Sequence, residues 1–128
     1  MKVLIFGLGG VGGFLGSYLL KTENEIFFLS RGKTFENINK NGLTLKSELG
    51  EIKFEKVNIF EKLPNNLIFD IVILSVKLYD LESSIDYLKE FINEKTIILP
   101  FQNGVFSEEV IYKKILLKNL LILENKIV

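Results

Sequence analysis

The stretch FGLGGVGGFLG, residues 6–16, begins at the last residue of the apolar run KVLIF at 2–6. Six of its eleven residues are glycine, which weakens strands and helices alike. Apolar residues then recur at spacings of three and four over 10–21, which predicts a helix. The run EIFFLS at 25–30 predicts a second buried strand. A strand, a helix and a strand within about thirty residues form one βαβ unit.

The glycines fit the pattern G-x-G-x-x-G at the junction of strand and helix. In a dinucleotide-binding fold the first glycine makes a tight turn, the second lets the backbone approach the pyrophosphate, and the third allows close packing of helix on strand. Free amides at the helix start then favour negative charge. We predict that this turn binds a dinucleotide through Gly7, Leu8, Gly9, Gly10, Val11 and Gly12, with Gly16 extending the close contact. A flexible turn in a domain without a ligand is the alternative.

The rest of the chain continues the alternation of strands and helices. A short helix is predicted in FENINK (35–40), a hairpin-like ribbon over 41–57, strands at 69–77, 95–101 and 119–123, and helices at 81–92 and 107–117. We therefore predict one α/β domain over 1–128, a Rossmann-type, doubly wound, mainly parallel sheet with helices on both faces. Ligands of such folds bind beyond the carboxyl ends of the strands.

Composition excludes several classes of function. Sixteen basic and sixteen acidic residues cancel, so the chain has no general electrostatic reason to bind nucleic acid or an anionic membrane. It contains neither cysteine nor histidine, which excludes disulfides and thiolate metal sites and removes the commonest general base. We expect no metal site. The first apolar run is too short to span a bilayer, and we expect a cytoplasmic protein.

The residues after the second strand bear on the choice of cofactor. An NAD-binding domain usually has an acidic residue there that accepts a hydrogen bond from the ribose 2′-hydroxyl, whereas an arginine suits a 2′-phosphate. This chain has Ser30 at that place, followed by Arg31 and, two residues on, Lys33. Because a guanidinium can bind phosphate in a bidentate way, the sequence favours NADP. The alternative is that Arg31 is an exposed surface residue.

Two more polar groups follow predicted strands. Lys77 ends the run IVILSVK, an unusual place for a charge unless it reaches water or faces a ligand. The turn PFQNG at 100–104 places Gln102 and Asn103, two uncharged amides, before Gly104. Each alone is more typical of a turn or a surface. Their common place at the carboxyl edge, beside the glycine turn, favours a site.

The ordered set GLGGVG, SRG, SVK and QNG, with the ribbon NGLTLKSELGEIKF, resembles the amino-terminal NADP-binding domain of the ketopantoate reductase (2-dehydropantoate 2-reductase) family over essentially all 128 residues. The resemblance implies reduction of 2-dehydropantoate to pantoate with NADPH, a step towards pantothenate and coenzyme A. It implies that the turn from Gly7 to Gly12 holds the pyrophosphate and Arg31 the 2′-phosphate. It places Lys77 and Asn103 near the nicotinamide side of the pocket, Asn103 also approaching a small keto-acid substrate.

The resemblance also implies what this chain lacks. Family members have a second, mostly helical domain that supplies a general-acid lysine and a substrate-binding acidic residue, so we expect no catalytic residue within 1–128. We expect the chain to bind NADPH and, alone, to turn over ketopantoate little or not at all. Self-association into a homo-oligomer through the surface that normally meets that domain is a further expectation.

The sequence leaves two other hypotheses about function open. One is the cofactor domain of another hydroxy-acid or polyol-phosphate dehydrogenase, against which the QNG turn argues mildly. The other is a non-enzymatic dinucleotide-sensing regulatory module. Such modules more often read NAD through an acidic residue after the second strand, which SRG lacks.

Overall fold

The computed structural model describes residues 1–8, 10–47, 50–77 and 80–100. Its centre is a five-stranded parallel sheet in the order β5-β2-β1-β6-β7. The strands are β1 (Lys2–Phe6), β2 (Glu25–Leu29), β5 (Asn58–Phe60), β6 (Ile71–Leu74) and β7 (Ile97–Pro100). The predicted helix at 107–117 and strand at 119–123 lie outside the described residues.

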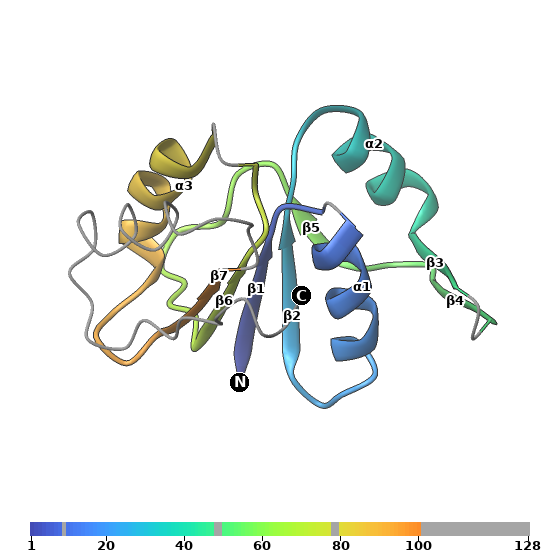
Figure 1. The fold of residues 1–128 in the computed structure, drawn as a ribbon, viewed down its shortest axis with the longest axis horizontal. Helices are drawn as coiled ribbons and strands as arrows, with labels where there is room; N and C mark the ends of the chain where they lie inside the picture. The colour runs from blue at the N-terminus through green and yellow to red at the C-terminus, as the bar shows by residue number, and fades with distance from the viewer. Residues whose placement is uncertain (9, 48–49, 78–79, 101–128) are drawn as a thin grey trace.

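Helices cover both faces of the sheet (Figure 1). They are α1 (Gly10–Leu19), α2 (Gly32–Asn41) and α3 (Leu81–Leu88), the last extended by the 3-10 turn η2 (Lys89–Phe91). A separate antiparallel hairpin of β3 (Leu43–Ser47) and β4 (Gly50–Phe54) follows α2. The doubly wound, mainly parallel α/β fold predicted from the sequence is confirmed.

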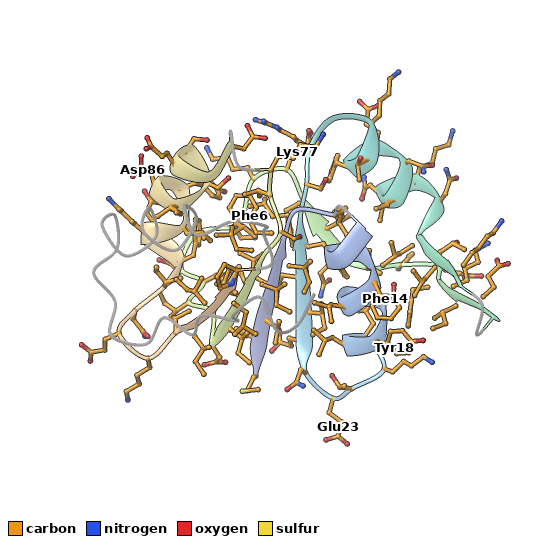
Figure 2. All side chains as sticks on the ribbon, in the orientation of Figure 1. Phe6, Phe14, Tyr18, Glu23, Lys77 and Asp86 are labelled. Carbon is orange, nitrogen blue, oxygen red and sulfur yellow. The ribbon has the colours of Figure 1, made fainter. Side chains whose placement is uncertain are left out.

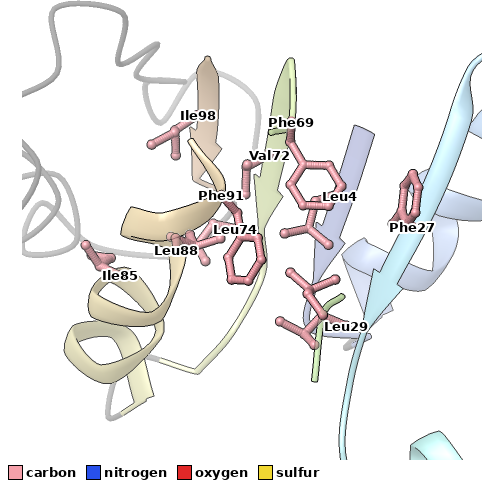
Figure 3. Close-up of a cluster of buried hydrophobic side chains, with 11 residues drawn as sticks. Leu4, Phe27, Leu29, Phe69, Val72, Leu74, Ile85, Leu88, Phe91 and Ile98 are labelled. Carbon is pink, nitrogen blue, oxygen red and sulfur yellow. The ribbon is translucent and has the colours of Figure 1, made fainter. Parts of the chain in front are cut away.

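The alternation of side chains along each strand divides the core in two. Leu4 and Leu74 point to the face covered by α3, where they form a buried cluster with Ile85 and Leu88 (Figure 3). Val3, Ile5, Ile26, Phe28 and Ile73 belong to the opposite cluster, which also includes partly buried residues of α1 and α2. Strands buried on both faces explain why the sequence shows continuous apolar runs.

The order of the strands reverses between β1 and β6. From β1 the chain passes through α1 to β2 on one side, and from β6 it passes through α3 to β7 on the other. Ligands of open α/β sheets bind at such a switch point, beyond the carboxyl ends of the strands. The residues that follow Phe6 and Leu74 therefore occupy the place where a site is expected.

The sequence did not predict strand β5. The three residues of β5 pair with β2 at the sheet edge, directly after the predicted ribbon, where the sequence predicted no strand or helix. So short a strand carries almost no periodic signal. The strand expected at 69–77 is shorter in the structure, so Ser75, Val76 and Lys77 lie beyond the end of β6.

Candidate dinucleotide site

A groove of about 650 Å³ opens at the carboxyl edge of the sheet. The turn after β1 contributes Gly7 and Leu8 to its walls, and the segment after β6 contributes Ser75, Val76 and Lys77. Further walls come from the end of β2, from the residue that follows β5 and from α3. The groove thus lies at the switch point and collects residues that are far apart in sequence.

Gly7 is held tightly at this point. Its φ of +94° lies in the region that favours glycine. Its amide donates to the carbonyl of Leu29 (3.0 Å), and its carbonyl accepts from Ser75 Oγ (2.7 Å). A Cβ on this residue would lie 2.9 Å from the carbonyl carbon and oxygen of Ser75. Gly7 therefore makes the tight turn that the motif predicts.

Gly12 and Gly16 allow α1 to pack closely on the sheet. A Cβ at Gly12 would overlap the carbonyl oxygen of Gly7 and Oγ of Ser75, and one at Gly16 would overlap the ring of Phe28. Gly13 has open space around it, the nearest atom being 4.0 Å from an added Cβ. The helix-packing roles predicted for Gly12 and Gly16 agree with this geometry, while Gly9 lies outside the described residues.

The start of α1 is suited to an anion. The helix begins at Gly10, and its first turn, which includes Val11 and Gly12, contains no acidic residue. The unpaired amides and the positive end of the helix dipole therefore meet no carboxylate within that turn. The tight turn at Gly7, next to a helix start without acidic residues, fits a dinucleotide pyrophosphate.

Arg31 lines the groove and is the N-cap residue of α2, with extended backbone. Its side chain is 81% exposed, and Nη2 lies 3.5 Å from Oδ1 of Asp80. Ser30 also lines the groove, and its amide donates to the carbonyl of Phe60 (3.0 Å). Lys33 is exposed and does not line the groove. The structure thus brings Arg31, but not Lys33, to the predicted place.

Lys77 lines the groove beyond the end of β6, and its side chain is exposed (Figure 2). Its carbonyl accepts a hydrogen bond from the amide of Asp80 (2.9 Å). Gln102, Asn103 and Gly104 of the other predicted strand end lie outside the described residues. Of the predicted polar groups, Arg31 and Lys77 are therefore the two that the structure places in one groove.

The groove is also lined by residues that the sequence did not single out. Among them are Glu61, which follows β5, together with Asp80 and Tyr87 of the α3 region. Oε2 of Glu61 accepts from the amide of Gly32 (3.0 Å), and the Tyr87 hydroxyl accepts from the amide of Leu63 (2.8 Å). The signal for Glu61 was its place after a strand, but that strand was not recognised.

Neither a metal centre nor a membrane span is found in the segments that the structure describes. Within them, acidic side chains form no group of three or more that could hold a metal ion. No helix in the same segments has the length and apolarity needed to cross a membrane.

Comparison with known proteins gives a consistent family. Residues 3–123 match the model of ketopantoate reductase PanE/ApbA. Over 112 residues (88% of this chain, 36% of the relative) the chain is 38% identical to the uncharacterized oxidoreductase YkpB of Bacillus subtilis. It is 36% identical to the 2-dehydropantoate 2-reductase of Aquifex aeolicus over 109 residues, 85% of this chain and 34% of that enzyme. The chain spans about a third of the length of these curated relatives.

Solved structures agree with this result. A 2-dehydropantoate 2-reductase from Geobacter metallireducens superposes with a TM-score of 0.80 at 26% identity, covering 88% of this chain and 37% of that one. D-mandelate dehydrogenase with NADH and anilino(oxo)acetate superposes with a TM-score of 0.86 at 25% identity, covering 95% of this chain and 40% of that one. The glycine turn, the strand order and these matches together show that the chain belongs to the ketopantoate reductase (PanE/ApbA) family.

Proposed function

We propose that this chain is the cofactor-binding domain of an NADPH-dependent 2-dehydropantoate 2-reductase, which reduces ketopantoate to pantoate on the way to pantothenate and coenzyme A. The observation that carries the proposal is that the glycine turn, hydrogen-bonded to Ser75, and Arg31 line the same groove. Relatives named 2-dehydropantoate 2-reductase, 28–36% identical over most of this chain, support the choice of substrate.

The residues have distinct roles in this proposal. Amides of the turn from Gly7 to Gly12 and of the α1 N-terminus would hold the pyrophosphate. Arg31 would bind the adenosine 2′-phosphate, because Ser30 stands where a repelling carboxylate would otherwise be. Lys77 and Asn103 would line the nicotinamide side. The bound nicotinamide supplies hydride, and the protein supplies its position.

Turnover requires groups beyond these roles. The general-acid lysine and the substrate-binding acid that the family resemblance implies belong to a second, helical domain. Reduction of a ketone needs a proton at the new alkoxide as well as hydride at carbon, and our assignment uses Lys77 for the cofactor. Residues 1–128 alone would therefore bind NADPH while reducing ketopantoate little or not at all.

The decisive experiment is calorimetric titration of the chain with NADPH and with NADH. We expect NADPH to bind at least about tenfold more tightly, a difference of about 1.4 kcal/mol. Arg31→Ala should abolish that preference. Lys33→Ala is the matched control. It also removes one positive charge, but Lys33 lies two residues after Arg31 and its exposed side chain is outside the groove. Equal loss of preference in both variants, or none in either, would contradict the role of Arg31.

A second candidate is an NADH-dependent reductase of another 2-keto acid. It is favoured by the close superposition on D-mandelate dehydrogenase with NADH. Glu61 also lines the groove and is held beside the residue that follows Arg31. Preference for NADH in the same titration would support this candidate. Comparable binding of the two cofactors with no effect of Arg31→Ala would instead favour a regulatory dinucleotide-sensing module.

A further inference from the structure

We propose that Asp80 is a specificity-determining residue that weakens the preference for NADPH by competing with the cofactor 2′-phosphate for Arg31. This inference rests on the proposed function, since it takes Arg31 as the partner of that phosphate. It adds an acidic residue, 49 positions away in sequence (80 minus 31), to the determinants of cofactor choice.

The pair of Arg31 and Asp80 spans the groove. Arg31 precedes α2 on the wall formed after β2, and Asp80 precedes α3 on the wall formed after β6. Nη2 of Arg31 lies 3.5 Å from Oδ1 of Asp80. The Asp80 side chain is only 31% exposed, whereas that of Arg31 is 81% exposed. A phosphate approaching the guanidinium therefore meets a carboxylate already beside it.

The carboxylate of Asp80 serves no capping role in α3. An aspartate at the N-cap usually accepts a hydrogen bond from an amide in the first turn. Here Asp80 is the N-cap residue but makes no side-chain capping bond. Ser83 Oγ and Ser84 Oγ donate to its backbone carbonyl instead (3.0 and 2.7 Å). Replacing the carboxylate by an amide thus leaves these hydrogen bonds of the helix start in place.

Glu61 acts in the same direction on the neighbouring donor. Its Oε2 accepts from the amide of Gly32, the residue directly after Arg31 (3.0 Å). The Arg31 guanidinium and the adjacent Gly32 amide thus each have a carboxylate partner, Asp80 and Glu61 respectively, and both of these acidic residues line the groove. A 2′-phosphate must displace or repel both carboxylates, while a cofactor with a free 2′-hydroxyl carries no such penalty.

The test compares four chains: the unaltered chain, Asp80→Asn, Asp86→Asn and Arg31→Ala. Asp86 is the matched control, because it is an aspartate within α3 that also has a surface ion pair, to Lys89 at 3.3 Å, and it does not line the groove. We expect Asp80→Asn to bind NADPH about two- to tenfold more tightly. The substitution removes the surface ion pair that competes for Arg31 and the repulsion between the Asp80 carboxylate and the 2′-phosphate. NADH affinity should change less than about twofold, and Asp86→Asn should leave both affinities unchanged.

The double variant Arg31→Ala with Asp80→Asn isolates the competition. In the Arg31→Ala background, Asp80→Asn should tighten NADPH binding by less than about twofold. Most of the gain in NADPH affinity depends on freeing the Arg31 guanidinium, which this background lacks. Glu61→Gln supplies a second route if Asp80→Asn does not fold. It keeps an oxygen for the Gly32 amide, removes the charge, and should also raise NADPH affinity selectively.

The outcomes separate the two proposals. Weaker or unchanged NADPH binding in Asp80→Asn, with Arg31→Ala still losing the preference for NADPH, would overturn the inference and leave the proposed function standing. No effect of Arg31→Ala on that preference would overturn the role of Arg31 and, with it, the competition. Equal gains in Asp80→Asn and Asp86→Asn would show a general charge effect and would overturn the role of Asp80.

Discussion

Oγ of Ser75 donates a hydrogen bond to the carbonyl oxygen of Gly7 at 2.7 Å, and the two residues are 68 positions apart in sequence. The bond joins the first residue after β1 to the first residue after β6. The amide of Ser75 also donates to the carbonyl of Phe6 (2.9 Å). The glycine turn is therefore fixed by the strand on the other side of the switch point, in addition to its own local conformation.

Ser75→Ala should loosen this turn. We expect the free energy of unfolding to fall by about 0.5–1.5 kcal/mol, the net value of one hydrogen bond, and NADPH affinity to fall several-fold because the amides lose their fixed orientation. Chemical denaturation and calorimetry measure the two effects. Ser17→Ala is the control, because it removes a serine hydroxyl that donates to a backbone carbonyl, that of Gly13 (2.8 Å), and Ser17 does not line the groove. Wild-type NADPH affinity in Ser75→Ala would show that the bond does not orient the turn.

Gly12→Ala should be far more damaging than Gly13→Ala. The new methyl group at position 12 overlaps the Gly7 carbonyl, whose backbone cannot move without disturbing the turn, whereas position 13 is open. We expect Gly12→Ala to cost about 1–3 kcal/mol of stability and to weaken NADPH binding more than tenfold. Gly13→Ala should keep binding and gain up to about 0.5–1 kcal/mol from helix propensity. Similar melting temperatures for the two variants would contradict this packing.

Gly16→Ala tests the contact between α1 and β2. Phe28 is completely buried, and its ring occupies the space that a methyl group at position 16 would need. We expect a loss of about 1–3 kcal/mol in the unfolding free energy. In a Phe28→Leu background the same change should cost less, because the smaller side chain leaves room, giving a coupling of about 0.5–3 kcal/mol in a double-mutant cycle. Strict additivity of the two changes would refute the contact.

Tyr87→Phe tests the wall of the groove near α3. The Tyr87 hydroxyl accepts a hydrogen bond from the amide of Leu63, a residue that is 3% exposed. The Tyr87 ring packs edge-on against Phe6, with 6.2 Å between the ring centroids. Removing the hydroxyl leaves a buried amide without this partner, so we expect a loss of about 1–3 kcal/mol. Tyr18→Phe on α1, outside the groove, is the control for the same chemical change. Unaltered thermal stability in Tyr87→Phe would count against the role of this bond.

Sequence reasoning recovered the fold because its signals are local. Apolar runs at 2–6 and 25–30, helical spacing after them and the register of Gly7, Gly12 and Gly16 depend on neighbours within a few residues. The structure confirms the mainly parallel, doubly wound sheet and the close packing at these glycines. The three-residue strand β5 was missed, because its place depends on pairing with β2 rather than on a pattern of its own.

The sequence by itself thus determined the class of fold, the glycine turn and the presence of Arg31 in place of an acidic residue after the second strand. Only the tertiary structure decided which groups face these residues. Parallel strands bring their carboxyl ends to one edge, so residues 31, 61, 75 and 80 meet in one groove although no local pattern links them. The partners Ser75 for Gly7 and Asp80 for Arg31 follow from strand order, because that order sets which distant strand ends become neighbours.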